Sequence, residues 1–258
     1  MAKKSLHFHE QSEKEFAQQL MSLFDTKSSW EVWSDFVTMS ALTIANAFDR
    51  EGKIHDKREK EYLRIISQYA KAKQQVFPEL FARLVDALDK NPEQDFLGKM
   101  CMVLGLGNHW KGQFFTPYSL CQMMAAITIS DKEEQMKERG WVGIHDACCG
   151  AGALLIAARN EMIRRGFGPR QALYVAQDID RTAALMCYLQ LSLLGCAGYV
   201  VVGDAITQPL VGPTGSLLLI TPTEKQEFWL MPAFYDKVWT YRVQFEKAMW
   251  LMMSKDKE

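Results

Sequence analysis

The chain has 258 residues, of which 48% are hydrophobic and 24% are charged, a composition ordinary for a globular protein of one large domain or two modest ones. No stretch reaches the roughly 18 uncharged apolar residues that a membrane span requires, and the N-terminus lacks the apolar core of a signal peptide, so we expect a cytoplasmic protein without membrane contact. The net charge of −1 lacks the basic excess that is typical of a protein that grips DNA unaided.

Residues 10 to about 108 carry patterns typical of helices. Apolar side chains between Trp30 and Ile44 recur at spacings of three and four, as on one buried helix face. Residues 53–73 are charged with embedded apolar positions and predict a second amphipathic helix. A break at Asn91-Pro92 separates the later helices of this part. Because strand-forming runs are lacking, we expect a helical N-terminal domain over residues 1–110.

The pattern changes after Gly107 to alternating strands and helices. The predicted strands are 141–146, 172–176 and 198–202, and the predicted helices are 120–129, 154–165, 181–194 and 241–255. The charged run 131–139 either extends the first of these helices or forms the following loop. Strands and helices that alternate at this spacing are typical of parallel strands joined by right-handed crossovers. We therefore expect an α/β domain over residues 111–258.

A glycine-rich turn from Asp146 to Gly152 joins the first predicted strand to a helix. Glycines let the backbone turn tightly and let a ligand approach closely, and the N-terminus of the helix adds free amide groups and a positive dipole end. Asp178 and Asp204 end the next two strands. In a nucleotide site the first of these carboxylates could accept hydrogen bonds from ribose hydroxyls, and the second from an adenine amino group. A single aspartate after a strand is most simply a cap of the following loop. Three aspartates at successive strand ends, Asp146, Asp178 and Asp204, favour a binding site.

Four ordered motifs resemble those of adenine-N6 DNA methyltransferases, in particular the modification subunits of type I restriction systems and their shorter relatives in mobile elements. The motifs are Gly112–Pro117, Asp146–Gly152, Ala176–Asp180 and Gly203–Asp204. The glycine turn departs from the family pattern at Ala147, where proline is usual, and at Ala151, where serine is usual. The resemblance implies a Rossmann-like class I S-adenosylmethionine methyltransferase sheet, here expected to be incomplete, behind the family's leading helical bundle.

The resemblance also implies that S-adenosyl-L-methionine is the cofactor. Thr116 and Pro117 would lie against its methionine end, Asp178 would bind the ribose and Asp204 the adenine. The full set of implied cofactor-binding residues is Phe115, Thr116, Pro117, Asp146, Cys148, Gly150, Gly152, Asp178, Ile179, Asp204 and Ala205. The six cysteines show no metal-ligand spacing, so we expect free, mostly buried thiols and no metal site.

The catalytic motif of that family, Asn/Asp/Ser-Pro-Pro followed by an aromatic residue, is absent from the sequence. In the family this motif holds the target amino group while the aromatic ring stacks on a flipped base. The best-placed candidate is Thr221-Pro222-Thr223-Glu224, which follows the apolar run Leu217–Ile220, so Thr221 and Pro222 are degenerate candidates for the catalytic position. The segment after Asp204 has room for one or two further strands and for no target-recognition domain.

These observations leave two functions open, with a third less favoured. The first is a modification subunit of a restriction-modification system that binds the cofactor and reaches DNA only through a partner specificity subunit. The second is a catalytically inactive binding or regulatory module with a methyltransferase fold. The third is methyl transfer to something other than DNA. A hetero-oligomer and a homo-oligomer are both compatible with the sequence.

Overall fold

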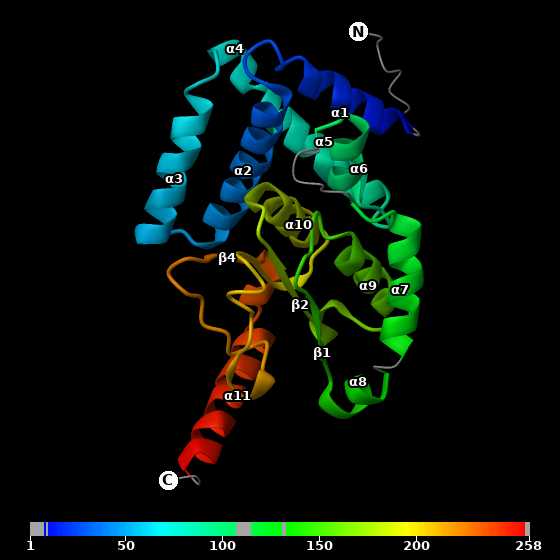
Figure 1. The fold of residues 1–258 in the computed structure, drawn as a ribbon, viewed down its shortest axis with the longest axis vertical. Helices are drawn as coiled ribbons and strands as arrows, with labels where there is room; N and C mark the ends of the chain where they lie inside the picture. The colour runs from blue at the N-terminus through cyan, green and yellow to red at the C-terminus, as the bar shows by residue number, and fades with distance from the viewer. Residues whose placement is uncertain (1–7, 9, 107–114, 131–132, 256–258) are drawn as a thin grey trace.

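The computed structural model describes residue 8 and residues 10–106, 115–130 and 133–255. In this part of the chain, helices from the N-terminal half and from the crossovers cover one face of a four-stranded sheet, and the last helix runs away from the sheet (Figure 1). None of the described helices combines the length and the apolar character needed to cross a membrane.

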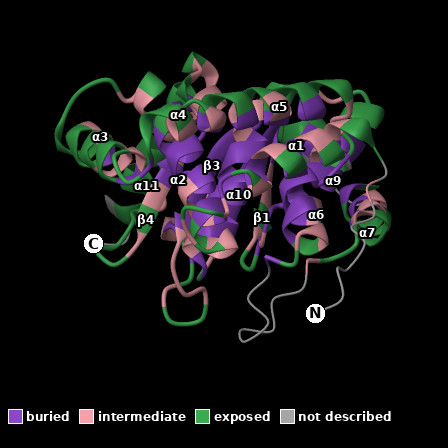
Figure 2. Ribbon diagram, turned by 90° about the horizontal axis from the view of Figure 1, so that it is seen from above, coloured by how far each residue is buried: buried purple, intermediate pink, exposed green. Residues whose placement is uncertain are grey.

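The N-terminal part is helical, as predicted. Its helices are α1 (Gln11–Met21), α2 (Ser29–Phe48), α3 (Lys53–Ile66), α4 (Lys71–Gln74), α5 (Val76–Lys90) and α6 (Phe96–Val103). Most of the apolar side chains of α2 are fully buried, which agrees with the spacing of three and four in its sequence (Figure 2). This long buried helix lies against the crossover helix that follows the second strand.

The prediction of one helix over 53–73 is wrong. Helix α3 ends at Ile66 and α4 begins only at Lys71. Between them, the ring of Tyr69 is buried edge-on against Phe77 at 4.7 Å. The side-chain amide of Gln74 donates to the carbonyl oxygens of Ile66 and Tyr69, which satisfies the free end of α3. Burial of this tyrosine therefore outweighs continuation of the amphipathic pattern.

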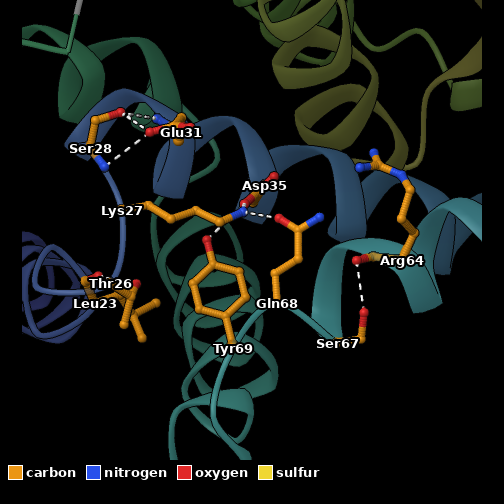
Figure 3. Close-up of polar contacts among 10 residues, drawn as sticks. All are labelled: Leu23, Thr26, Lys27, Ser28, Glu31, Asp35, Arg64, Ser67, Gln68 and Tyr69. Atoms are coloured by element: carbon orange, nitrogen blue, oxygen red, sulfur yellow. Dashed lines mark hydrogen bonds and ion pairs between the residues drawn. The ribbon is translucent and has the colours of Figure 1, made fainter.

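Polar contacts at the start of α2 fix the turn between α3 and α4 to the rest of the bundle (Figure 3). Ser28 and Glu31 form a reciprocal capping box. Asp35 Oδ2 accepts from Lys27 Nζ at 2.6 Å and from the Tyr69 hydroxyl at 2.7 Å. The carboxylate of Asp35 thereby joins three separate segments of the bundle.

Strands and helices alternate in the C-terminal part, and the three predicted strands are confirmed. The elements are α7 (Tyr118–Ser130), α8 (Glu133–Arg139), β1 (Val142–Asp146), α9 (Ala153–Arg164), β2 (Ala172–Asp178), α10 (Arg181–Leu193), β3 (Ala197–Val202), β4 (Glu227–Leu230) and α11 (Lys237–Lys255), with short 3₁₀ turns at Pro169–Gln171, Pro213–Gly215 and Pro232–Tyr235. Strands β1, β2 and β3 are parallel neighbours, with Ile144 opposite Tyr174 and Tyr174 opposite Gly198. The charged run 131–139 forms a separate helix over its described part.

The sheet order is β1-β2-β3-β4, and β4 is antiparallel to β3. Three parallel strands in this order match one half of a doubly wound sheet, in which the next strand would lie beside β1. Among the described residues no strand pairs with that outer edge of β1. The apolar run Leu217–Ile220 is not a strand here: the Leu217 side chain lies against Gly143 of β1, and the Tyr199 hydroxyl donates to the Leu217 carbonyl at 2.5 Å.

The two faces of the sheet are covered unequally. On one face, a single hydrophobic cluster joins the N-terminal helices to α7, α9 and α10, with Trp33 and Tyr188 among its fully buried members. On the other face, a smaller cluster packs Leu210, Leu218 and Trp239 over the strands. Five of the six cysteines are buried, Cys148 is exposed and all are free, as expected.

Candidate functional site

The glycine turn lies between the end of β1 at Asp146 and the start of α9 at Ala153. Gly150 and Gly152 have φ angles of 53° and 94°, in the left-handed region that favours glycine. A β-carbon on Gly152 would lie 2.9 Å from Cys187 Sγ of α10, and one on Gly150 would lie 3.2 Å from the ring of Phe115. Both glycines are therefore required by backbone conformation and by close packing.

Two hydrogen bonds hold the turn against the end of β2. Cys149 N–H donates to the Gln177 carbonyl at 2.9 Å, and Gly150 N–H donates to Asp178 Oδ2 at 2.8 Å. Asp178 Oδ1 accepts from Asp180 N–H at 2.8 Å. Burial raises the pKa of Asp178, although these two backbone donors oppose the shift. Each carboxylate oxygen keeps a second lone pair, so Asp178 can both fix the turn and accept from a ligand.

Asp146 lies at the carboxyl end of β1, beside the same turn. Its Oδ1 accepts from Cys148 N–H at 3.1 Å, whereas its Oδ2 is buried and has no hydrogen-bond partner among the described residues. Burial raises the pKa of this carboxyl group above its ordinary value. A cavity of about 250 Å³ between α7, β1 and α9 reaches Asp146 and Ala147. A buried acceptor without a donor beside a cavity is the kind of group that a ligand satisfies.

The segment before α7 contributes one apolar side chain to the turn. Phe115 is half-buried against Gly150, while Thr116 and Pro117 are exposed. The carbonyl of Pro117 accepts from Leu120 N–H and begins α7. The first residues of this motif, 112–114, lie outside the described residues.

Asp204 lies in the loop after β3 and is engaged within that loop. Its Oδ1 accepts from Ile206 N–H and its Oδ2 from the Thr207 hydroxyl, both at 2.9 Å. The donated N–H of Ile206 is the main cause that lowers the pKa of Asp204. Ala205 beside it is half-buried. At the end of β2, the Ile179 side chain is 71% exposed, an apolar surface next to the Asp178 carboxylate.

The degenerate catalytic candidates lie elsewhere. Thr221 and Pro222 are exposed, and Pro222 lines a cavity of about 670 Å³ together with Ile54 and Glu61 of α3. This cavity lies beside β4 and extends to Arg181 at the start of α10, whereas the glycine turn follows β1. The structure thus gathers Phe115, Asp146, Cys148, Gly150, Gly152 and Asp178 around one turn. It places Pro222 in a separate cavity beside β4.

Sequence analysis missed a buried network behind the turn. Gln190 of α10, fully buried, donates from Nε2 to Asp95 Oδ1 at 2.8 Å and to the Ala151 carbonyl at 2.9 Å. Its Oε1 accepts from Leu97 N–H at 3.0 Å, and Asp95 also caps α6 by accepting from Gly98 N–H at 2.9 Å. The network joins the N-terminal bundle to the glycine turn. In the sequence, the signal for this network is Gln190, a polar residue in the mostly apolar second half of the predicted helix 181–194.

Asp95→Asn should abolish a pH dependence of stability. Burial raises the pKa of Asp95 in the folded protein, so the folded state holds this proton to higher pH than the unfolded chain does. The stabilising contribution is therefore complete below the unfolded-state pKa and is lost as pH rises through the folded-state pKa. Asparagine keeps the Oδ1 acceptor without the charge, so the variant should be at least as stable as the wild type at neutral pH. Urea unfolding from mildly acidic to neutral pH measures this, and a less stable variant at neutral pH would contradict it.

Comparison with known proteins identifies the family of this region. No curated protein matches the chain significantly. The model of the N-6 DNA methylase family matches residues 106–230, which include the glycine turn, Asp178 and Asp204. The resemblance to adenine-N6 DNA methyltransferases is thereby confirmed, and the match ends at the last residue of β4. Residues 106–230 of this chain belong to the N-6 DNA methylase family.

Proposed function

We propose that this chain binds S-adenosyl-L-methionine at the glycine turn and acts as a modification subunit for adenine-N6 methylation of DNA. The observation that carries the proposal is the bond from Gly150 N–H to Asp178 Oδ2, which sets a left-handed glycine turn against a strand-end carboxylate. The Oδ2 of Asp146, which has no partner among the described residues, adds a buried acceptor at the same turn. This arrangement has the features that a nucleoside with an attached cationic group requires.

The side chains at the glycine turn have the chemistry that this cofactor requires. Asp178 would accept from the ribose hydroxyls, while Ile179 and Phe115 offer apolar surface to the flat adenine and to the methionine chain. The carboxylates of Asp146 and Asp178 place negative charge near a sulfonium ligand. When bound, S-adenosyl-L-methionine supplies an electrophilic methyl group. The chain's own residues bind and orient it.

DNA target recognition is proposed to come from a partner specificity subunit. The net charge of −1 provides no general attraction for phosphates, and base-specific reading requires a surface that reaches the groove or a flipped base. Purified alone, the protein should therefore bind DNA weakly and with strong salt dependence.

The alternative is a catalytically inactive binding or regulatory module. It is favoured by the segment 221–224, which lacks the family's amide and aromatic groups and lines a cavity separate from the one beside Asp146. Transfer of a labelled methyl group to host DNA separates the two functions. Incorporation that depends on Asp178 supports the enzyme, and cofactor binding without incorporation supports the module.

Asp178→Ala should weaken S-adenosyl-L-methionine binding about 10- to 100-fold, because it removes the ribose acceptor and the anchor of Gly150. Isothermal titration calorimetry measures this directly. Asp178→Asn retains an acceptor for Gly150 N–H, so its affinity for S-adenosyl-L-methionine should lie between those of the wild type and Asp178→Ala.

The matched control is Asp86→Ala, which removes an exposed carboxylate of the same kind on α5. It should leave the affinity unchanged. Equal affinity of the wild type and Asp178→Ala would remove Asp178 from the site, and no binding by the wild type would overturn the proposal of a cofactor site.

A further inference from the structure

Helix α11 is packed along its first half, as far as Glu246. Trp239 is buried, with its ring stacked on Phe234 at 6.2 Å and edge-on to Trp141 at 5.7 Å. Beyond this anchor the helix runs away from the sheet toward the C-terminus (Figure 1). Seven large apolar side chains are exposed along it: Tyr241, Phe245, Met249, Trp250, Leu251, Met252 and Met253.

The exposed side chains form more than a single stripe. Tyr241, Phe245, Met249 and Met253 follow one another at intervals of four and lie on one face. Trp250 and Leu251 extend the apolar surface around the helix over its last turns. A helix that is apolar on more than one face is normally buried in a larger assembly. Scattered exposed apolar residues would need no such explanation, whereas this contiguous set does.

A groove accompanies the same helix. A cavity of about 560 Å³ lies between α11, the end of α8 and the loop before β4. Trp141, Leu219 and Val238 line it, and Phe245, Met249 and Met253 continue the lining along α11. Arg139, Arg242 and Glu246 also line it, and Arg139 forms an ion pair with Glu246. The groove is therefore mostly apolar, and one of its walls is the exposed face of α11 itself.

The exposed area is sufficient for a stable interface. If a fully exposed side chain of this size offers roughly 150–250 Å², the exposed fractions of the seven amount to roughly 800 Å². One partner in a standard protein–protein interface contributes about the same area, ~800 Å². The helix and its groove could thus form an interface without any contribution from the rest of the surface.

We propose that α11 is a homodimerisation element, and that the α11 helices of two copies of this chain pack in each other's groove about a two-fold axis. The helix that fills the groove of one copy and the wall of that groove then both present the apolar side chains of α11. A two-fold axis lets each copy bury its exposed helix and fill its groove in one step. The near-zero net charge of the chain adds little repulsion between the copies.

The test is the oligomeric state of the full chain, measured by sedimentation equilibrium in the micromolar range. The wild type should be a dimer. Phe245→Glu together with Met249→Glu should raise the dimer dissociation constant more than about a hundredfold, since the two-fold axis buries each added charge twice. Both side chains are exposed in the single chain, so the thermal midpoint of a monomeric sample should hardly change.

Leu63→Glu is the control, because Leu63 is a comparably exposed apolar side chain on α3. It should leave the dimer intact. A monomeric wild type, or a dimer that survives the double substitution, overturns the proposal. A monomer that sediments with vesicles of anionic lipid would assign α11 to a membrane surface instead. Cofactor binding plays no part in this readout, so the proposal stands or falls separately from the proposed function.

Discussion

Gly198→Ala should strongly destabilise the native fold. Gly198 is in β3 with a φ of 144°, and a β-carbon there would lie 1.8 Å from the carbonyl oxygen of Tyr174 in the neighbouring strand. This contact is with backbone in the middle of the sheet, so no side chain can move aside. The strain of the φ angle and the separation of β2 from β3 should together cost more than about 4 kcal/mol. Equilibrium unfolding in urea, with circular dichroism as the signal, measures the loss.

Gly195→Ala is the matched control for that prediction. Gly195 precedes the same strand and has a φ of 73°, but a β-carbon there meets no atom within 4 Å. It should cost about 1–2 kcal/mol, the penalty of a left-handed conformation alone. If the two variants lose the same stability, the close approach of β2 and β3 at Gly198 does not exist in solution.

Gln190→Ala should both destabilise the protein and loosen the glycine turn. The substitution leaves the Asp95 carboxyl group, the Ala151 carbonyl and the Leu97 N–H without the partner they share, all of them in the interior. Unpaired buried groups of this kind cost about 1–3 kcal/mol each, and we expect a total loss of about 3–5 kcal/mol. Hydrogen exchange of the turn amides, such as Gly152 N–H, should become faster even without any ligand.

Gln177→Ala supplies the comparison for Gln190. Gln177 is also fully buried, but its side chain donates one hydrogen bond, to the Gln208 carbonyl at 3.0 Å. Its replacement removes the same volume with one bond in place of three. If both variants lose the same free energy of unfolding, the lost side-chain volume and not the hydrogen-bond network determines stability. Unchanged hydrogen exchange at the turn in Gln190→Ala would likewise contradict a role of the network.

The three parallel strands could be predicted because their signals are local. Each is a short apolar run followed by a glycine or an aspartate, and the helix patterns between them fix their direction. Strand β4 could not be predicted, because Glu227–Leu230 is short and its pairing of Trp229 with Val200 depends on distant parts of the chain. The run Leu217–Ile220 has the better strand composition, but its side chains are used to cover the sheet. A run of four apolar residues does not distinguish these two uses.

The same contrast holds for the site. Asp146, Gly150 and Asp178 were expected together because the carboxyl ends of parallel strands meet at one edge, and the structure places them there. The link between Asp95 and Gln190 joins positions far apart in the sequence, and no spacing rule connects them. The position of Pro222 beside α3 likewise depends on how the loop after β3 crosses the sheet.

One hydrophobic cluster runs from α2 through α10 to the sheet, so the N-terminal bundle is not an independent module. Trp33 and Phe36 of the N-terminal bundle share this cluster with Leu185 and Tyr188, and Gln190 carries a polar link from α6 to the turn. The bundle thus supports the glycine turn through packing and through the hydrogen bonds of Gln190. A bundle borrowed from another protein would have to match the surface of α10 residue by residue. Sequence change in this bundle is therefore constrained by the shape of the glycine turn, which the cluster and Gln190 support.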